Sequence, residues 1–197
     1  MKLLRQGYVT APLIGALWMV IMATTVAVSM SFATGEAFRP AILTCLFLGA
    51  GLGLVALFVR DYWLISIAAV AVSGLGLFVG LQPIVLGESV TSIQKMITAL
   101  LLGLGSGPAI LKMVEELHAG ALTRHEFEEA WIRFLTGFGY IFFTVIVVIP
   151  FYVMVMTSLK SQQALLQNPL DFSLDLSKGT GLFRSYVELF GQFNFGR

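Results

Sequence analysis

The chain has 197 residues, of which 57% are hydrophobic and 12% are charged, and its formal net charge is +1. Soluble domains usually carry about 25% charged residues, so this composition excludes an ordinary water-soluble surface and predicts a chain surrounded largely by a lipid bilayer. The small net charge provides no basic surface for nucleic acid, and no nucleic-acid partner is expected.

Charged residues divide most of the chain into five uncharged stretches of 30, 20, 26, 16 and 26 residues, which cover 6–35, 40–59, 62–87, 96–111 and 134–159. About 20 apolar residues of helix cross a bilayer core, so four of the stretches are long enough. We therefore expect an all-α, polytopic membrane protein with about five transmembrane helices. The first stretch is too long for a signal peptide and is expected to be a retained helix.

Residues 1–111 are expected to form an N-terminal bundle of about four spans with very short connections. Glycine-rich runs at 49–57 and 73–80 favour close approach of helix backbones in lipid. The predicted spans contain no charged residue, which argues against proton-coupled transport. Because catalysis needs convergent polar groups, we expect no enzyme activity, no catalytic or metal site, and no cofactor.

The fourth stretch, 96–111, is the shortest and contains Gly103, Gly105, Gly107 and Pro108. Its 16 residues would span only about 24 Å as a helix, so the sequence predicts a short or broken helix. It either crosses the membrane, with the flanking lysines reaching the two headgroup regions, or forms a re-entrant segment. We favour the crossing.

Residues 112–134 are expected to form a cytoplasmic amphipathic linker. Gly120 is expected to end a first short helix, and Thr123 and Glu126 match a capping box that starts a second. The second helix carries apolar residues at helical spacing: Phe127, Trp131 and Phe134. This pattern predicts a helix that lies at the membrane interface and continues into the last span.

Two histidines of the linker, His118 and His125, could suggest a metal site together with Glu129. The segment has no second histidine at i+4 and no HExxH pattern. A solvated polar face is therefore the expected interpretation.

The last span is expected over about 134–159, with Pro150 as a kink at membrane depth. It ends in two short motifs, Pro150-Phe151-Tyr152 and Thr157-Ser158-Leu159-Lys160. The polar tail that follows contains two more, Asn168-Pro169-Leu170 and Ser185-Tyr186-Val187-Glu188-Leu189-Phe190. This order resembles the first core helix and outer segment of permease subunits from bacterial binding-protein-dependent sugar ABC importers, of the maltose-transporter second-subunit kind. The motif positions are Pro150, Phe151, Tyr152, Thr157, Ser158, Lys160, Pro169 and Tyr186.

The resemblance covers about residues 136–197, and its motif residues do no chemistry. It implies a protein of the bacterial plasma (inner) membrane that works with a second permease subunit, cytoplasmic ATP-binding subunits and a periplasmic sugar-binding protein. Residues 135–197 would then be the start of a permease core, either truncated or completed elsewhere, because the EAA coupling loop and the substrate-lining helices are missing. The alternative is a small polytopic assembly or regulatory protein of another class. No sugar-binding residue is assigned.

The Lys and Arg residues of the connections predict a cytoplasmic N-terminus. In that orientation Lys2, Arg5, Arg60, Lys112, Arg124 and Arg133 lie inside, and Arg39 and Lys95 lie outside. Five spans then put the chain from Lys160 onward outside, whereas a re-entrant fourth stretch would change the side of one end.

Cysteine labelling tests this topology, because Cys45 is the single cysteine of the chain. In a Cys45→Ser background, Lys2→Cys should react with a membrane-impermeant thiol reagent only from the cytoplasmic side, and Lys178→Cys only from outside. Intact cells and inverted vesicles are compared. Labelling of Lys178→Cys from the cytoplasmic side alone would contradict five spans.

Overall fold

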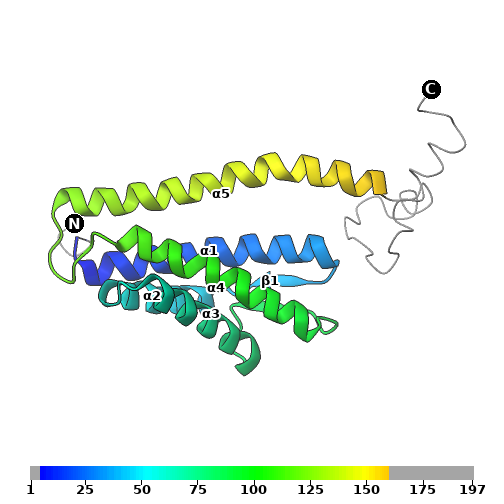
Figure 1. Ribbon diagram of the computed structural model, residues 1–197, viewed down its shortest axis with the longest axis horizontal. Coiled ribbons are helices and arrows are strands. Elements are labelled where there is room, and N and C mark those ends of the chain that lie inside the picture. Colours follow the sequence, from blue (N-terminus) through cyan, green and yellow to red (C-terminus); the bar gives the residue numbers. More distant parts are fainter. Residues whose placement is uncertain (1–4, 160–197) are drawn as a thin grey trace, which may run out of the picture.

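A computed structural model describes residues 5–159 of the chain, which are mostly helical (Figure 1). The elements are α1 (Gly7–Thr34), β1 (Phe38–Pro40), α2 (Ile42–Phe58), α3 (Tyr62–Val79), β2 (Ile84–Leu86), α4 (Ser92–Val114) and α5 (Arg124–Leu159). Four of these helices, α1, α3, α4 and α5, are long and apolar enough to cross a membrane, while α2 has 17 residues and is shorter. The helices are therefore compatible with a membrane protein.

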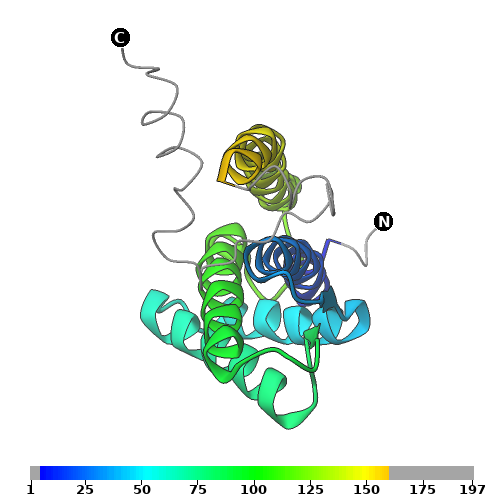
Figure 2. The ribbon, with the colours of Figure 1, turned by 90° about the vertical axis from the view of Figure 1, so that its right-hand side faces the viewer.

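Helices α1 to α4 form one bundle, and α5 lies beside it as a separate layer (Figures 1 and 2). Within the bundle α1 packs mainly on α2, and α3 packs mainly on α4, while α4 also contacts α1 and α2. The helices pass back and forth between two ends of the molecule. We call the end that holds 5–7, 59–61 and 115–123 the basic end, after the Lys and Arg residues that gather there together with acidic residues. The end that holds 35–41 and 80–91 is called the opposite end.

Backbone and side-chain hydrogen bonds join the segments of the basic end. The Gly7 N–H donates to the Gly120 carbonyl over 2.9 Å, and the Leu122 N–H donates to the Arg5 carbonyl over 2.8 Å. The Arg60 guanidinium donates to the Leu117 carbonyl over 2.7 Å. Three connections that lie far apart in the sequence therefore form one surface.

The described Lys and Arg residues divide between the two ends as the sequence predicts. Arg5, Arg60, Lys112, Arg124 and Arg133 lie at or near the basic end, and Arg39 and Lys95 lie at or near the opposite end. The uneven distribution of Lys and Arg between the two ends is thus a property of the folded chain. That the basic end is the cytoplasmic one stays a prediction.

A small antiparallel sheet closes the opposite end, and the all-α prediction did not include it. Its pairs are Phe38↔Leu86, Arg39↔Val85 and Pro40↔Ile84. The α1–α2 and α3–α4 connections both turn at this end, so two extended segments come side by side and satisfy each other's backbone groups. A strand of three residues has too few positions to show an alternating pattern, so periodicity could not reveal it.

Helix α4 is one continuous helix of 23 residues with Pro108 inside it, so the expectation of a short or broken helix was wrong. At about 1.5 Å per residue it is about 34 Å long, which is enough to cross a bilayer core. The Thr91 hydroxyl accepts from the Gln94 N–H over 3.4 Å, and the Gln94 side chain accepts from the Thr91 N–H over 2.8 Å. This capping box starts the helix four residues before Met96 and fits the crossing alternative.

Helix α3 is shorter than its uncharged stretch. It ends at Val79, and Gly80 follows with φ of 101°, a left-handed conformation that favours glycine. The rest of the stretch forms the turn and β2. Apolar length alone therefore overestimated this span.

Glycines make the closest contacts between helices. A Cβ on Gly49 would lie 2.3 Å from the carbonyl oxygen of Gly15, and a Cβ on Gly103 would lie 2.4 Å from the Cα of Val70. The backbones of α1 and α2, and of α3 and α4, therefore touch, as expected for small residues between helices in lipid. In the predicted run at 73–80, a Cβ on Gly76 would lie 2.8 Å from the Leu81 carbonyl oxygen, in the connection after α3, while Gly74 meets only the Ala99 side chain, at 3.9 Å.

A single added methyl group tests this packing. Gly49→Ala should lower the free energy of unfolding by about 1–3 kcal/mol, because its Cβ would collide with the α1 backbone. Gly51→Ala is the matched control on the same helix, since its Cβ would meet nothing within 4 Å. Reversible denaturation in detergent measures both, and equal stability of the two variants would show that the contact does not matter.

Candidate functional site on helix α5

Helix α5 begins with the capping box that the sequence predicted. The Thr123 N–H donates to the Glu126 carboxylate over 2.7 Å, and the Glu126 N–H donates to the Thr123 hydroxyl over 3.3 Å. His118 Nδ1 lies 3.3 Å from the same carboxylate group. Because these bonds satisfy free backbone groups at its first turn, the helix begins at Arg124.

The second helix of the linker continues into the last span, as the sequence predicted. Residues 124–134 are the first turns of the 36-residue helix α5. The first short helix of the linker is absent: α4 runs to Val114 and ends there, six residues before Gly120. The linker is therefore the end of α4, a connection, and the start of α5.

The apolar stripe of this segment faces the bundle. Phe134 is buried, and its ring centroid lies 5.6 Å from that of Trp131 and 6.2 Å from that of Trp18 in α1. Phe127 also packs against the core. The stripe thus attaches the base of α5 to α1 instead of covering lipid.

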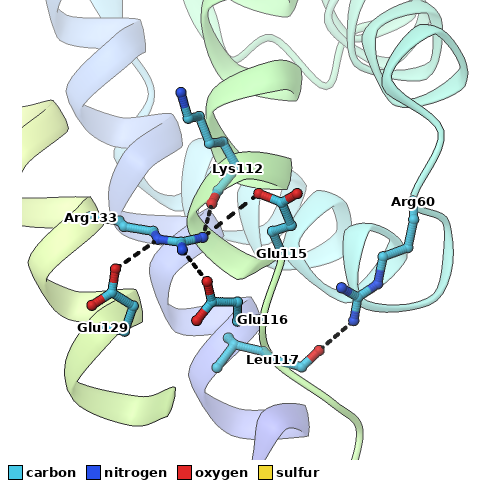
Figure 3. Close-up of polar contacts among 7 residues, drawn as sticks. All are labelled: Arg60, Lys112, Glu115, Glu116, Leu117, Glu129 and Arg133. Carbon is cyan, nitrogen blue, oxygen red and sulfur yellow. Dashed lines mark hydrogen bonds and ion pairs between the residues drawn. The ribbon is translucent and has the colours of Figure 1, made fainter. Parts of the chain in front are cut away.

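Arg133 joins the base of α5 to the end of α4 (Figure 3). Its Nε lies 3.2 Å from the Glu129 carboxylate, and its Nη2 bonds the Glu116 carboxylate. Its Nη1 lies 3.7 Å from the Glu115 carboxylate and donates to the Lys112 carbonyl over 3.1 Å. The side chain is 26% exposed. One guanidinium therefore pairs with three carboxylates, two that follow α4 and one in α5, a geometry that suits its fork of donors. We call these four side chains the Arg133 cluster.

At the far end of α5 a second attachment involves Tyr152. Its hydroxyl donates to the Phe32 carbonyl over 2.8 Å, and the two rings lie 5.6 Å apart, centroid to centroid. Within the described part of α5 the buried residues are Ala130, Phe134 and Met156. The helix is thus held near its two ends, and the bundle covers little of it in between.

The most exposed face of the second half of α5 is apolar. Five residues at spacings of three and four form what we call the outer stripe, and their exposed fractions range from 57% to 72%: Tyr140, Phe143, Val147, Phe151 and Met154. Residues at this spacing lie on one side of a helix. An exposed apolar face of this size requires lipid or another protein to cover it.

The predicted motif residues are spread along α5 and do not form one cluster. Pro150 and Phe151 are exposed within the continuous helix, and Tyr152 makes the contact with Phe32. The hydroxyls of Thr157 and Ser158 donate to carbonyls of their own helix over 2.8–3.0 Å. Lys160, Pro169 and Tyr186 lie outside the described residues.

The candidate metal residues are not brought together. His118 contacts Glu126 and the Ala121 carbonyl, while Glu129 pairs with Arg133. Among residues 5–159, no three His, Cys, Asp or Glu side chains are grouped so that they could hold a metal ion.

Comparisons with protein-family models, with curated proteins and with solved structures find no match to this chain.

In the sequence, the only sign of the Arg133 cluster is the i,i+4 spacing of Glu129 and Arg133. Substitution of Arg133 tests the cluster. Arg133→Gln should lower the free energy of unfolding by about 1 kcal/mol, because three carboxylates lose their common cation. Arg124→Gln removes the same charge from an exposed pair with Glu128 on the same helix and should change little. Denaturation in detergent compares them, and an equal effect of both variants would contradict a role of Arg133 in attaching α5.

Proposed function

We propose that this chain is the membrane-spanning N-terminal part of a permease subunit of an ATP-driven sugar importer. The observation that supports it best is the outer stripe of α5. A helix that its own bundle covers so little is suited to pack against further helices of a transport complex. The order of motifs at the end of α5 and beyond it agrees with the first core helix of such permeases.

In this proposal the two parts of the structure have different tasks. Helix α5 is the first helix of the translocation core, and α1 to α4 form an additional bundle outside that core. The basic end lies in the cytoplasm of a bacterium, on the side of the ATP-binding subunits, and the opposite end faces the periplasmic sugar-binding protein. A second permease subunit completes the path, and rocking of the two permeases gives alternating access.

Residues 1–197 do not suffice for transport in this scheme. They contain no EAA loop to receive an ATPase, and one core helix cannot enclose a sugar. The Arg133 cluster gives α5 a fixed attachment at the cytoplasmic side, so that the additional bundle would move together with the core helix. The tight α1–α4 bundle would also suit an assembly or regulatory protein, which is the alternative function.

Co-purification tests the proposal. The gene product, tagged and extracted from its native membrane in mild detergent, should carry an ATP-binding subunit and a second permease subunit in near-stoichiometric amounts. Mass spectrometry identifies the partners. Purification without any ATP-binding subunit would contradict the proposal and favour the assembly or regulatory function.

Reconstitution adds a functional readout. The 197-residue chain with a cognate ATPase and binding protein should show neither sugar uptake nor stimulated ATP hydrolysis, because coupling needs the missing loop. The same chain joined to the downstream core helices should support both. Uptake by the 197-residue form alone would point to a transporter of another kind.

A further inference from the structure

A pocket at the basic end lies between the start of α3 and the end of α4. Its volume is about 550 Å³, and its lining includes Arg60, Tyr62, Pro108, Leu111, Lys112 and Glu115. The polar residues lie toward the end of the molecule, and Pro108 lies one helical turn further into the apolar part of α4. The pocket therefore joins a charged mouth to an apolar wall.

The charged residues of this lining are two cations, Arg60 and Lys112, and one carboxylate, Glu115. Arg60 donates to the Leu117 carbonyl, and neither Arg60 nor Lys112 forms an ion pair within the described residues. The carboxylate in the lining, Glu115, lies 3.7 Å from Arg133 and is neutralised in part by it. Two cations are thus free to meet an anion.

The pocket also lies at the level where aromatic residues gather. Tyr62 and Trp63 begin α3 and are both exposed, with their ring centroids 5.6 Å apart. Such rings are typical of the boundary between headgroups and acyl chains. This places the two cations at headgroup depth in a bilayer.

An apolar track leads from the pocket toward the middle of α4. Leu101, Leu104, Pro108 and Lys112 follow one another at spacings of three and four, so they share one face of the helix. Leu101 and Leu104 are exposed. A charged mouth above an exposed apolar track matches the two parts of a phospholipid.

We propose that this pocket binds an anionic phospholipid, whose phosphate lies between Arg60 and Lys112 and whose acyl chain follows Leu104 and Leu101. In Figure 3 the Lys112 ammonium extends away from Arg60, and rotation about its flexible side-chain bonds brings it to the shared phosphate. Basic pockets between membrane helices hold such headgroups elsewhere. The proposal requires the chain to lie in a membrane, but it does not depend on transport.

Titration with defined lipids tests the site. The whole chain in neutral detergent is titrated with phosphatidylglycerol and with phosphatidylcholine, and bound lipid is counted by native mass spectrometry. Arg60→Gln with Lys112→Gln should weaken phosphatidylglycerol binding about tenfold or more, since each cation near an anionic lipid contributes to affinity. Phosphatidylcholine binding should not change.

The matched control is Arg39→Gln with Lys95→Gln, which removes the same charge at the opposite end and should leave phosphatidylglycerol binding within about twofold of the unaltered chain. Lys112→Gln alone should weaken phosphatidylglycerol binding by an intermediate factor. The Lys112 side chain makes no bond within residues 5–159, so this variant should fold normally, and it decides the outcome if Arg60→Gln disturbs folding.

Equal phosphatidylglycerol affinity in the unaltered chain and in the Lys112→Gln variant would overturn the proposal. An equal loss in the control pair would overturn it as well, because the effect would then be one of net charge. Displacement of the lipid by millimolar inorganic phosphate would assign the pocket to a soluble anion. Each of these results leaves the transport proposal untouched, so the two can fail separately.

Discussion

The bundle of α1 to α4 depends on direct backbone contact between helices at a few glycines. In lipid, apolar side chains gain no hydrophobic free energy by packing on one another, so helices associate where their backbones come close. Gly15 and Gly49 bring α1 and α2 together, and Gly103 does the same for α4 against Val70 of α3. Since these contacts involve backbone atoms, a side chain at any of these positions would separate the helices. The buried hydroxyls of Ser66 and Thr98 do not compete with this packing, because they donate to carbonyls of their own helices.

Helix α5 has the opposite character. Bulky aromatic and branched residues make up most of its apolar part, and three residues of its described part are buried. Its Gly137 approaches side chains, those of Trp18 and Met113, and not the backbone of another helix. Polar and aromatic contacts attach it near its two ends, through Arg133 and Tyr152. Such an arrangement keeps the helix in place while leaving its apolar face free for lipid or for other helices. The structure thus separates a part that is packed with itself from a part that is open to its surroundings.

Charge spacing and apolar length predicted the number of helices and the grouping of the connections, because water-soluble charges cannot enter the bilayer core. They did not predict where helices begin and end. Gly103, Gly107 and Pro108 were interpreted as breaking α4, yet the glycines are the positions where α3 approaches it. Composition cannot distinguish a glycine that ends a helix from one that makes room for a neighbour. The sheet at 38–40 and 84–86 and the Arg133 cluster were not foreseen either, since both depend on residues that only the tertiary fold brings together.

In the proposed function, other helices cover the outer stripe of α5. A photoreactive amino acid at Phe143 or Phe151 tests it most directly in the native membrane, with Leu43 of α2 as an exposed reference position on the bundle. We expect both α5 positions to form a cross-link to another membrane polypeptide upon illumination, and the Leu43 position to give lipid adducts. Lipid adducts alone at Phe143 and Phe151 would show that α5 faces the bilayer and would contradict the proposal that it belongs to a translocation core.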